Sequence, residues 1–148
     1  MSLAMVGHHA SYEFRWRRWA LLRDVVAAHL EDAAAGRRFP RFASIGDALG
    51  VTALRLPAAD LTAEVRAIKE ALAGRSIEEL VMGPLTARVL YPNVKLEIAR
   101  PLTRAEVAQV APPGDAKTLD AYFASMLDSM LEVCASPYPD GAIEVLDG

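Results

Sequence analysis

The clearest pattern of apolar and polar positions lies near the end of the chain, over residues 115–137. Apolar residues recur there at spacings of three and four, at Leu119, Phe123, Met126, Met130, Val133 and Cys134. This spacing places them on one side of an α-helix. Asp115 is the expected N-terminal cap, and Pro137 disfavours helical geometry at Ser136. The pattern therefore predicts a long amphipathic helix from Asp115 to Ser136 whose apolar side faces a core.

Two more helices are predicted from the same spacing. The first covers residues 17–35, follows a short strand over residues 11–16, and has Gly36 as its C-terminal cap. The second begins at Asp60, an expected cap, and ends before Gly74. Its apolar seam consists of Leu61, Val65, Ile68 and Leu72.

Alternation of apolar and polar residues predicts further strands. Residues 85–91 and 94–98 alternate in this way on either side of Pro92-Asn93, which predicts an antiparallel hairpin. A turn at residues 139–141 precedes a last strand over residues 142–146. The inward residues of this strand are expected to be Ile143 and Val145. We expect the strand to pair with another strand, because a terminal strand stays ordered only when it is paired.

Shorter segments connect these elements. Residues 36–42 break the periodicity and predict a loop. One turn of helix is expected from Ser44 to Gly50, followed by a strand over residues 51–56 that Pro57 ends. Two capping boxes, Ser76–Glu79 and Thr103–Glu106, predict two more short helices.

Together these elements predict a single α+β domain for the 148 residues. Its mixed or antiparallel sheet of four to five strands is covered by helices and includes a long C-terminal amphipathic helix. A doubly wound parallel sheet is the alternative, and it fits less well because helices and strands do not alternate regularly. Met1-Ser2-Leu3 resembles an expression leader, so these three residues are left out of the fold prediction, and residues 1–10 are expected to be flexible or non-native.

Composition indicates a reducing compartment. The single cysteine, Cys134, cannot form an internal disulfide. No apolar run approaches the ~18 residues that span a bilayer, and the start of the chain lacks the pattern of a secretory signal. Arginine outnumbers lysine 13 to 3 and alanine is frequent, a bias typical of GC-rich bacterial genomes. We therefore expect a soluble, cytoplasmic bacterial protein that does not bind membranes.

The net charge of −3 conceals an uneven distribution. Residues 1–41 contain seven basic and four acidic residues, a net charge of +3. Residues 111–148 contain seven acidic residues and one basic residue, Lys117, a net charge of −6. The two ends are expected to attract each other within one chain or between two copies, and this polarity favours association.

Common motifs of catalysis and cofactor binding are absent from the sequence. There is no phosphate-binding loop ending in Gly-Lys-Ser/Thr, no Gly-x-Gly-x-x-Gly, no His-Glu-x-x-His, no Cys-x-x-Cys and no Gly-x-Ser-x-Gly. His8-His9 offers imidazoles suited to zinc or nickel, but adjacent histidines near a terminus favour an unstructured or tag-like segment. We therefore predict no cofactor and no metal site.

Three polar residues are candidates for an enzymatic or small-molecule site. His29 lies beside the apolar side of the first long helix and could act as a general base, although a boundary histidine bonded to the backbone is the simpler interpretation. Ser125 and Ser129 lie one turn apart at the border of the last helix and could line a cleft. Cys134 is expected to be a buried structural thiol, because the end of a helix disfavours a thiolate.

Arginines interleaved with aromatic residues make Phe14–Trp19 the most unusual local sequence. Such a mixture can hold phosphates while bases stack, as in proteins that bind single-stranded nucleic acid. The acidic chain and the lack of a recognised nucleic-acid module favour contact with an anion or an acidic partner instead. The arginines proposed for that contact are Arg15, Arg17, Arg18, Arg37, Arg38 and Arg41. Arg88, on the polar face of its strand with Thr86, is a further candidate for ligand binding.

These observations rank three functions. The first is non-catalytic binding of a protein partner or of a second copy of the chain, in an accessory, regulatory or immunity-type role. The second is an enzyme or small-molecule binder with a dispersed pocket between the sheet and the C-terminal helix. The third is nucleic-acid binding through the arginines and tryptophans. The first ranks highest because the chain combines core-forming elements with charge polarity and carries no catalytic motif.

Overall fold

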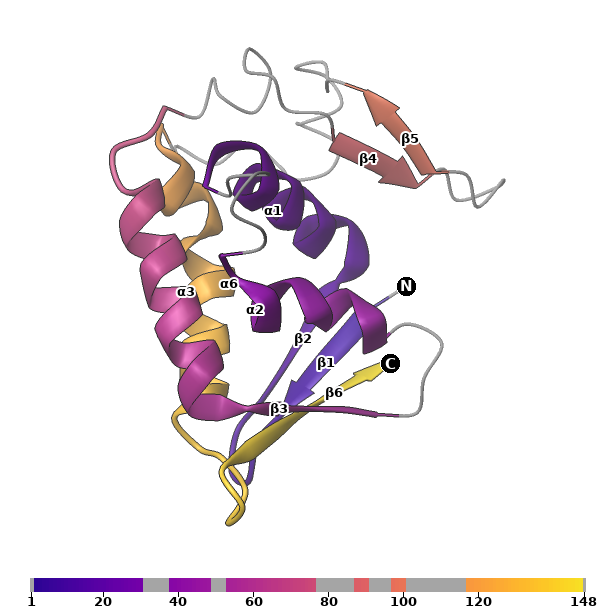
Figure 1. Ribbon diagram of the computed structural model, residues 1–148, viewed down its shortest axis with the longest axis vertical. Coiled ribbons are helices and arrows are strands. Elements are labelled where there is room, and N and C mark those ends of the chain that lie inside the picture. The colour runs from indigo at the N-terminus through magenta and orange to yellow at the C-terminus, as the bar shows by residue number, and fades with distance from the viewer. Residues whose placement is uncertain are drawn as a thin grey trace.

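The computed structural model describes residues 2–30, 38–48, 53–76, 87–90, 97–100 and 117–147. Four strands form an antiparallel sheet with the order β2-β1-β6-β3. Their bounds are Ser2–Val6 for β1, Ser11–Arg15 for β2, Leu54–Pro57 for β3 and Ala142–Asp147 for β6. Helices pack on this sheet (Figure 1). The predicted α+β class and its antiparallel sheet are confirmed, and the parallel alternative is wrong.

Strand β1 lies in the middle of the sheet, between β2 and β6. Leu3 pairs with Phe14 on one side and with Asp147 on the other, and both Leu3 and Met5 are fully buried. The prediction that residues 1–10 are flexible is therefore wrong for Ser2–Val6. The reason is physical: the strand pairs with β2, its neighbour in a hairpin, and with β6, which lies at the far end of the sequence.

One face of the sheet carries the core. The buried residues on this face alternate along the strands and are Leu3, Met5, Phe14, Leu56, Ile143 and Val145. The predicted last strand and its two inward residues are thus confirmed, and β6 pairs with both β1 and β3. The turn before it is also confirmed, since Gly141 has a φ of 84° and its amide donates a hydrogen bond to the Tyr138 carbonyl at 2.8 Å.

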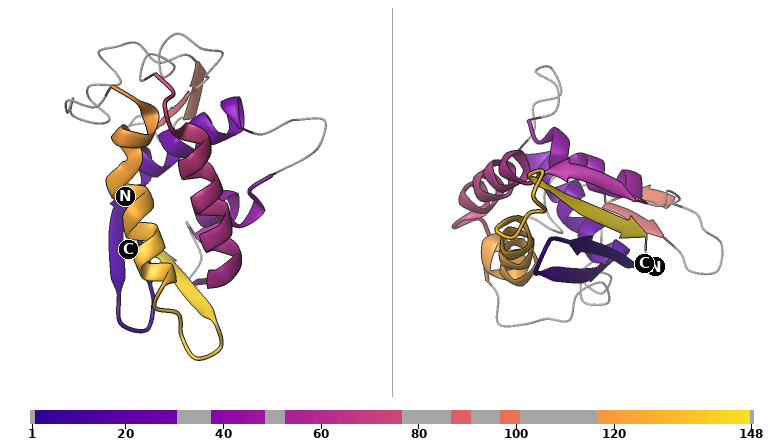
Figure 2. Two further views of the ribbon diagram at one scale, coloured as in Figure 1. Left: turned by 90° about the vertical axis from the view of Figure 1, so that its left-hand side faces the viewer. Right: turned by 90° about the horizontal axis from the view of Figure 1, so that it is seen from below.

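The helices of the described part are α1 (Trp16–His29), α2 (Pro40–Ser44), α3 (Ala58–Leu72) and α6 (Leu119–Cys134), with one turn of 3-10 helix, η1 (Ile45–Ala48). Helices α3 and α6 lie side by side against the sheet (Figures 1 and 2). Helix α1 continues directly from β2, and α2 packs on α3. The core therefore lies between one face of the sheet and these helices.

Helix α6 confirms the predicted amphipathic helix in a shorter form. All six apolar positions that define the pattern are buried, and so is Leu127. The helix begins at Leu119 rather than beside Asp115, because Thr118 is its N-cap and the Thr118 hydroxyl accepts a hydrogen bond from the Ala121 amide at 3.4 Å. Its 16 residues make an element about 24 Å long.

Helix α3 confirms its predicted seam. The four seam residues, Leu61, Val65, Ile68 and Leu72, are fully buried. The helix begins two residues before the expected cap Asp60, at Ala58, and Pro57 is its N-cap. Gly74 follows the helix with a φ of 78°, a left-handed conformation that favours glycine after a helix.

Helices α1 and α2 differ from the predicted boundaries. Helix α2 begins inside residues 36–42, which were expected to form a loop. Pro40 can open this helix, because its missing N–H would have no partner in the first turn. The helical turn expected after Ser44 is present as η1. Helix α1 begins at Trp16 and ends at His29 with Leu30 as its C-cap, so it is shorter than the predicted helix over residues 17–35. The expected cap, Gly36, lies outside the described residues.

Strands β4 (Ala87–Leu90) and β5 (Glu97–Arg100) confirm the predicted antiparallel pair. They form a two-stranded sheet of their own beside α1 and do not join the four-stranded sheet. The two short helices predicted from capping boxes, over residues 76–81 and after Thr103, lie outside the described residues or at their limit.

The turn between β1 and β2 packs against the C-terminal end of α6. The Gly7 amide donates to the Ala10 carbonyl at 2.8 Å, and the His8 amide donates to the Ser136 carbonyl at 2.7 Å. The His9 amide donates to the Ser136 hydroxyl at 2.9 Å. Since the last carbonyl groups of a helix lack partners within it, amides near this end are favourable. The prediction of an unstructured segment at His8-His9 is therefore wrong.

Candidate functional site

Arg18 links helix α1 to helix α6. Its Nη2 donates a hydrogen bond to the Tyr122 carbonyl oxygen at 3.1 Å, and its Cζ lies 5.4 Å from the centroid of the Tyr122 ring. A guanidinium is attracted by the negative face of an aromatic ring. Arg18 therefore contacts the C-terminal helix through a carbonyl oxygen and an aromatic ring, whereas the charge pattern predicted a carboxylate as its partner.

Tyr12 of β2 lies near the same guanidinium. Its ring stacks on Phe14, with 5.6 Å between the ring centroids. Burial raises the pKa of the Tyr12 and Tyr122 hydroxyls above the ordinary value, and the positive charge of Arg18 offsets part of that rise. Both phenols are therefore neutral near neutral pH. Tyr12, Arg18 and Tyr122 form a half-buried aromatic and cationic cluster beside β2.

The other predicted arginines are not part of this cluster. Arg15 is exposed at the end of β2. Arg38 is exposed, and its Cζ lies 5.0 Å from the centroid of the Phe39 ring. Arg41 contacts α3. Outside the described part lie the side chains of Arg17 and Arg88 and the whole of Arg37.

The three candidates for an enzymatic site occupy two different helices. His29 is half-buried at the end of α1. Ser125 is exposed and Ser129 is half-buried on α6, on the side of that helix that also carries Tyr122. Within the described ranges, neither serine hydroxyl makes a hydrogen bond to His29. The two serines therefore belong to the surface beside Tyr122.

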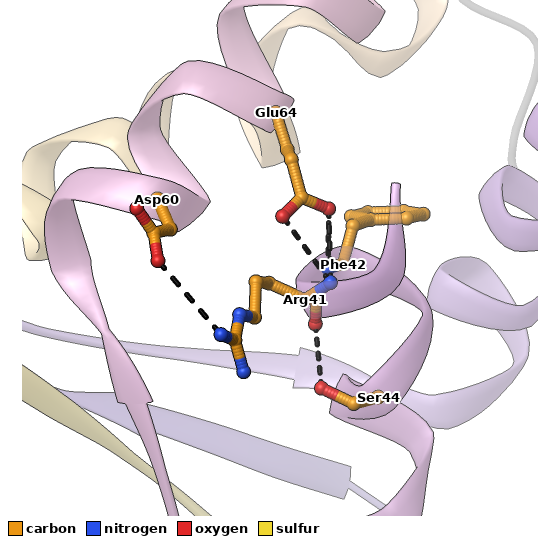
Figure 3. Close-up of polar contacts among 5 residues, drawn as sticks. All are labelled: Arg41, Phe42, Ser44, Asp60 and Glu64. Atoms are coloured by element: carbon orange, nitrogen blue, oxygen red, sulfur yellow. Dashed lines mark hydrogen bonds and ion pairs between the residues drawn. The ribbon is translucent and has the colours of Figure 1, made fainter. Parts of the chain in front are cut away.

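A second polar arrangement joins α2 to α3 (Figure 3). The Glu64 carboxylate accepts hydrogen bonds from the Arg41 amide at 2.9 Å and from the Phe42 amide at 3.1 Å. These amides lie in the first turn of α2, where the helix itself offers them no acceptor. The Arg41 guanidinium is 3.9 Å from the Asp60 carboxylate, and the Ser44 hydroxyl donates to the Arg41 carbonyl at 2.7 Å. Glu64 therefore caps α2 from a neighbouring helix.

Replacing Glu64 with alanine is expected to lower the free energy of unfolding by about 1 kcal/mol, because the two α2 amides lose their acceptor. Glutamine keeps one acceptor oxygen, so Glu64→Gln is expected to remain within about 0.5 kcal/mol of the wild type at neutral pH. Urea denaturation followed by circular dichroism measures both differences. Equal losses for the two variants would contradict the capping role.

The same pair of proteins tests a pH dependence. Burial raises the pKa of Glu64 above 4.5, and the two amide hydrogen bonds only partly offset this rise. A carboxyl group with a raised folded-state pKa binds its proton more tightly in the folded chain, so its contribution to stability falls as the pH rises through the range just above 4.5. Relative to Glu64→Gln, the wild type is expected to gain stability on acidification from neutral pH. A constant difference between the two would refute this.

The acidic C-terminal region pairs with the middle of the chain. Arg55 of β3 forms ion pairs with Asp140 and, at 3.0 Å, with Glu144. Lys69 of α3 pairs with Asp128 of α6. These partners differ from the N-terminal arginines that the charge pattern suggested, because the sheet order places β3 beside β6 and the packing places α3 beside α6.

Cys134 is buried, and burial raises the pKa of its thiol, which confirms the predicted buried position. His8 and His9 are exposed, with their ring centroids 4.0 Å apart. Among the residues that the structure describes, no group of three or more His, Cys, Asp or Glu side chains is placed to hold a metal ion. No helix within these residues has both the length and the apolar character needed to cross a membrane.

Tyr12 and Tyr122 are the candidate binding residues that sequence reasoning did not single out. Tyr122 lies within the predicted C-terminal helix and Tyr12 within the predicted strand over residues 11–16, and neither belongs to a recognised binding motif. Their contact with Arg18 depends on packing between α1 and α6, and Arg18 and Tyr122 are 104 positions apart. No local pattern could have indicated it.

The chain matches no protein-family model, and no curated protein or solved structure is significantly similar to it.

Proposed function

We propose that this protein acts by non-catalytic binding of another protein chain, in an accessory, regulatory or immunity-type role. The binding site is the β2 surface, which we define as Tyr12, Glu13, Arg15, Arg18 and Tyr122. One observation carries the proposal. Strand β2 is an edge of the four-stranded sheet, and among the described residues its backbone has no partner on the side away from β1.

An edge strand offers a row of N–H and C=O groups to which a strand from another chain can pair. The side chains around β2 suit the same purpose. Tyrosine and arginine are enriched in protein interfaces and among the residues that dominate their binding energy. The β2 surface contains two of each. All five side chains are exposed or half-buried and therefore accessible to a partner.

The proposal places the protein in the cytoplasm of a bacterium. Its one cysteine, Cys134, is free and buried. It therefore forms no disulfide within the chain, and its thiol is not exposed to a partner. This cysteine usage is typical of proteins from reducing compartments.

Site-specific photo-crosslinking in cells tests the proposed function. A photoreactive phenylalanine analogue replaces Tyr12, and the matched control carries it at Arg66, an exposed position on α3. We expect protein adducts from position 12, either with the chain itself or with another protein, and few from position 66. Mass spectrometry identifies the crosslinked chain. An absence of adducts at position 12, or equal yields from both positions, would overturn the proposed function.

A further inference from the structure

The two edges of the sheet differ in how they are protected. Strand β3 has four residues and ends in Pro57, which has no N–H to donate. Strand β2 has five residues and no proline. It also carries no charged residue on its inner face, where Tyr12 and Phe14 lie. Edge strands that must stay unpaired are usually short, or carry proline or an inward-pointing charge. β2 is therefore the edge that is open to pairing.

A second copy of this chain is a partner whose fit to β2 can be judged residue by residue. In an antiparallel pairing, residues directly opposite each other lie on the same face of the sheet. A two-fold axis that continues the sheet must therefore bring inner residues opposite inner residues and outer residues opposite outer ones. The axis can then pass beside Tyr12, Glu13 or Phe14.

Charge distinguishes these three registers. An axis at Glu13 sets the two Glu13 carboxylates directly opposite each other, and like charges in that position are destabilising. An axis at Tyr12 pairs residues 11–13 of the two copies and sets Glu13 opposite the uncharged Ser11. An axis at Phe14 pairs residues 13–15 of the two copies and sets Glu13 of each copy opposite Arg15 of the other, so that two ion pairs form by symmetry.

Both charged residues are available for these pairs. Glu13 and Arg15 are exposed and lie on the outer face of β2. The Glu13 carboxylate accepts a hydrogen bond from the Ser2 hydroxyl at 2.9 Å, which holds it on that face and leaves its second oxygen for another donor. Arg15 makes no ion pair with any residue of the described ranges. Opposite charges directly across two strands stabilise the pairing.

We propose that the protein forms a homodimer in which β2 pairs antiparallel with β2 of a second copy, in the register centred on Phe14. This inference rests on the proposed function, because it names the partner of the β2 surface. The dimer joins the two sheets into one continuous sheet with the order β3-β6-β1-β2-β2-β1-β6-β3. Tyr12, Arg18 and Tyr122 flank the new strand pair and extend the contact on its helical side.

Charge reversal and its rescue test the register. The variants are Glu13→Arg, Arg15→Glu and the double variant that carries both. Glu132→Arg and Arg66→Glu make the same charge changes at exposed positions on α6 and α3. Sedimentation velocity over a wide concentration range measures the dissociation constant of each dimer, and circular dichroism verifies that each variant is folded.

We expect either single variant to weaken the dimer at least about tenfold, because two attractive pairs become repulsive. The double variant is expected to return to within about threefold of the wild type, since each pair is restored with its charges exchanged. The two controls are expected to dimerise like the wild type. A wild type that is monomeric at every concentration would overturn the homodimer. Single variants that dimerise normally, or a double variant that stays weak, would overturn the register.

The crosslinking result separates failure of this inference from failure of the proposed function. A monomer that forms adducts with a different protein from position 12 keeps the proposed function and removes the homodimer. A dimer that gives no adducts from position 12 overturns both, because its interface then lies away from β2.

Discussion

Replacing Gly7 with alanine is expected to destabilise the fold by about 3 kcal/mol or more. A Cβ atom at this position would lie 2.9 Å from the Val133 carbonyl oxygen and closer still to the Ser136 carbonyl oxygen. Both oxygens belong to the backbone, so the clash is relieved only if the β1–β2 turn moves away from α6. That movement would break the hydrogen bond from the His8 amide to Ser136. Urea denaturation measures the loss in free energy of unfolding.

Gly74→Ala is the matched control for this variant. A Cβ atom on Gly74 would meet nothing within 4 Å, although its φ of 78° is unfavourable for alanine. The control therefore shows the cost of placing alanine in a left-handed conformation without a clash, about 1 kcal/mol, whereas Gly7 has no positive φ and its replacement meets only the steric cost. A loss for Gly7→Ala no larger than the loss for Gly74→Ala would contradict the packing of the turn on α6.

Removing residues 1–6 is expected to abolish cooperative folding. The deletion takes away β1, the strand that is hydrogen-bonded to both β2 and β6. It also removes Leu3 and Met5 from the core. Truncating a single buried side chain of this size to alanine costs roughly 2–5 kcal/mol, whereas a whole domain is stable by only about 5–15 kcal/mol. Thermal unfolding followed by circular dichroism should show no cooperative transition for the shortened chain.

Point variants of β1 keep the full length of the chain, so they show whether the buried side chains of this strand stabilise the fold. Met5→Ala is expected to cost about 2–5 kcal/mol and to leave a folded protein. Ala4→Ser, on the opposite, half-buried face of β1, is expected to cost less than about 0.5 kcal/mol. A shortened chain that unfolded at the wild-type temperature would show that these residues are a leader and that β1 is not part of the sheet.

Sequence reasoning succeeded where the physical signal is local. The apolar sides of α3 and α6 follow from helical spacing, and the inward residues of β6 follow from strict alternation. It failed for β1, because five residues with weak alternation become a strand only through pairing with β2 and β6. It failed in a similar way for the start of α2, since the acceptor for its first amides is Glu64, a residue of another helix.

The candidate site was less predictable than the fold. The sequence drew attention to Arg15 and Arg18, because arginine next to aromatic residues is suited to contacts with an anion or an acidic partner. It did not indicate that Arg18 meets Tyr122, or that Asp140 and Glu144 pair with Arg55. The net charge of a segment shows whether it attracts acidic or basic residues. Which residues it pairs with depends on the order of the strands and on the packing of the helices.

The position of β1 beside β6 also has a consequence during protein synthesis. Leu3 pairs with Asp147, so this contact closes a loop that contains nearly all the residues of the chain. The entropy cost of closing so long a loop makes the contact slow to form. On the ribosome, β1 and β2 can form their hairpin early, but the other edge of β1 stays unpaired until β6 emerges. An unpaired edge on a partly folded chain invites aggregation. We therefore expect a nascent chain stalled before residue 142 to depend on chaperones, and the released chain to fold without them.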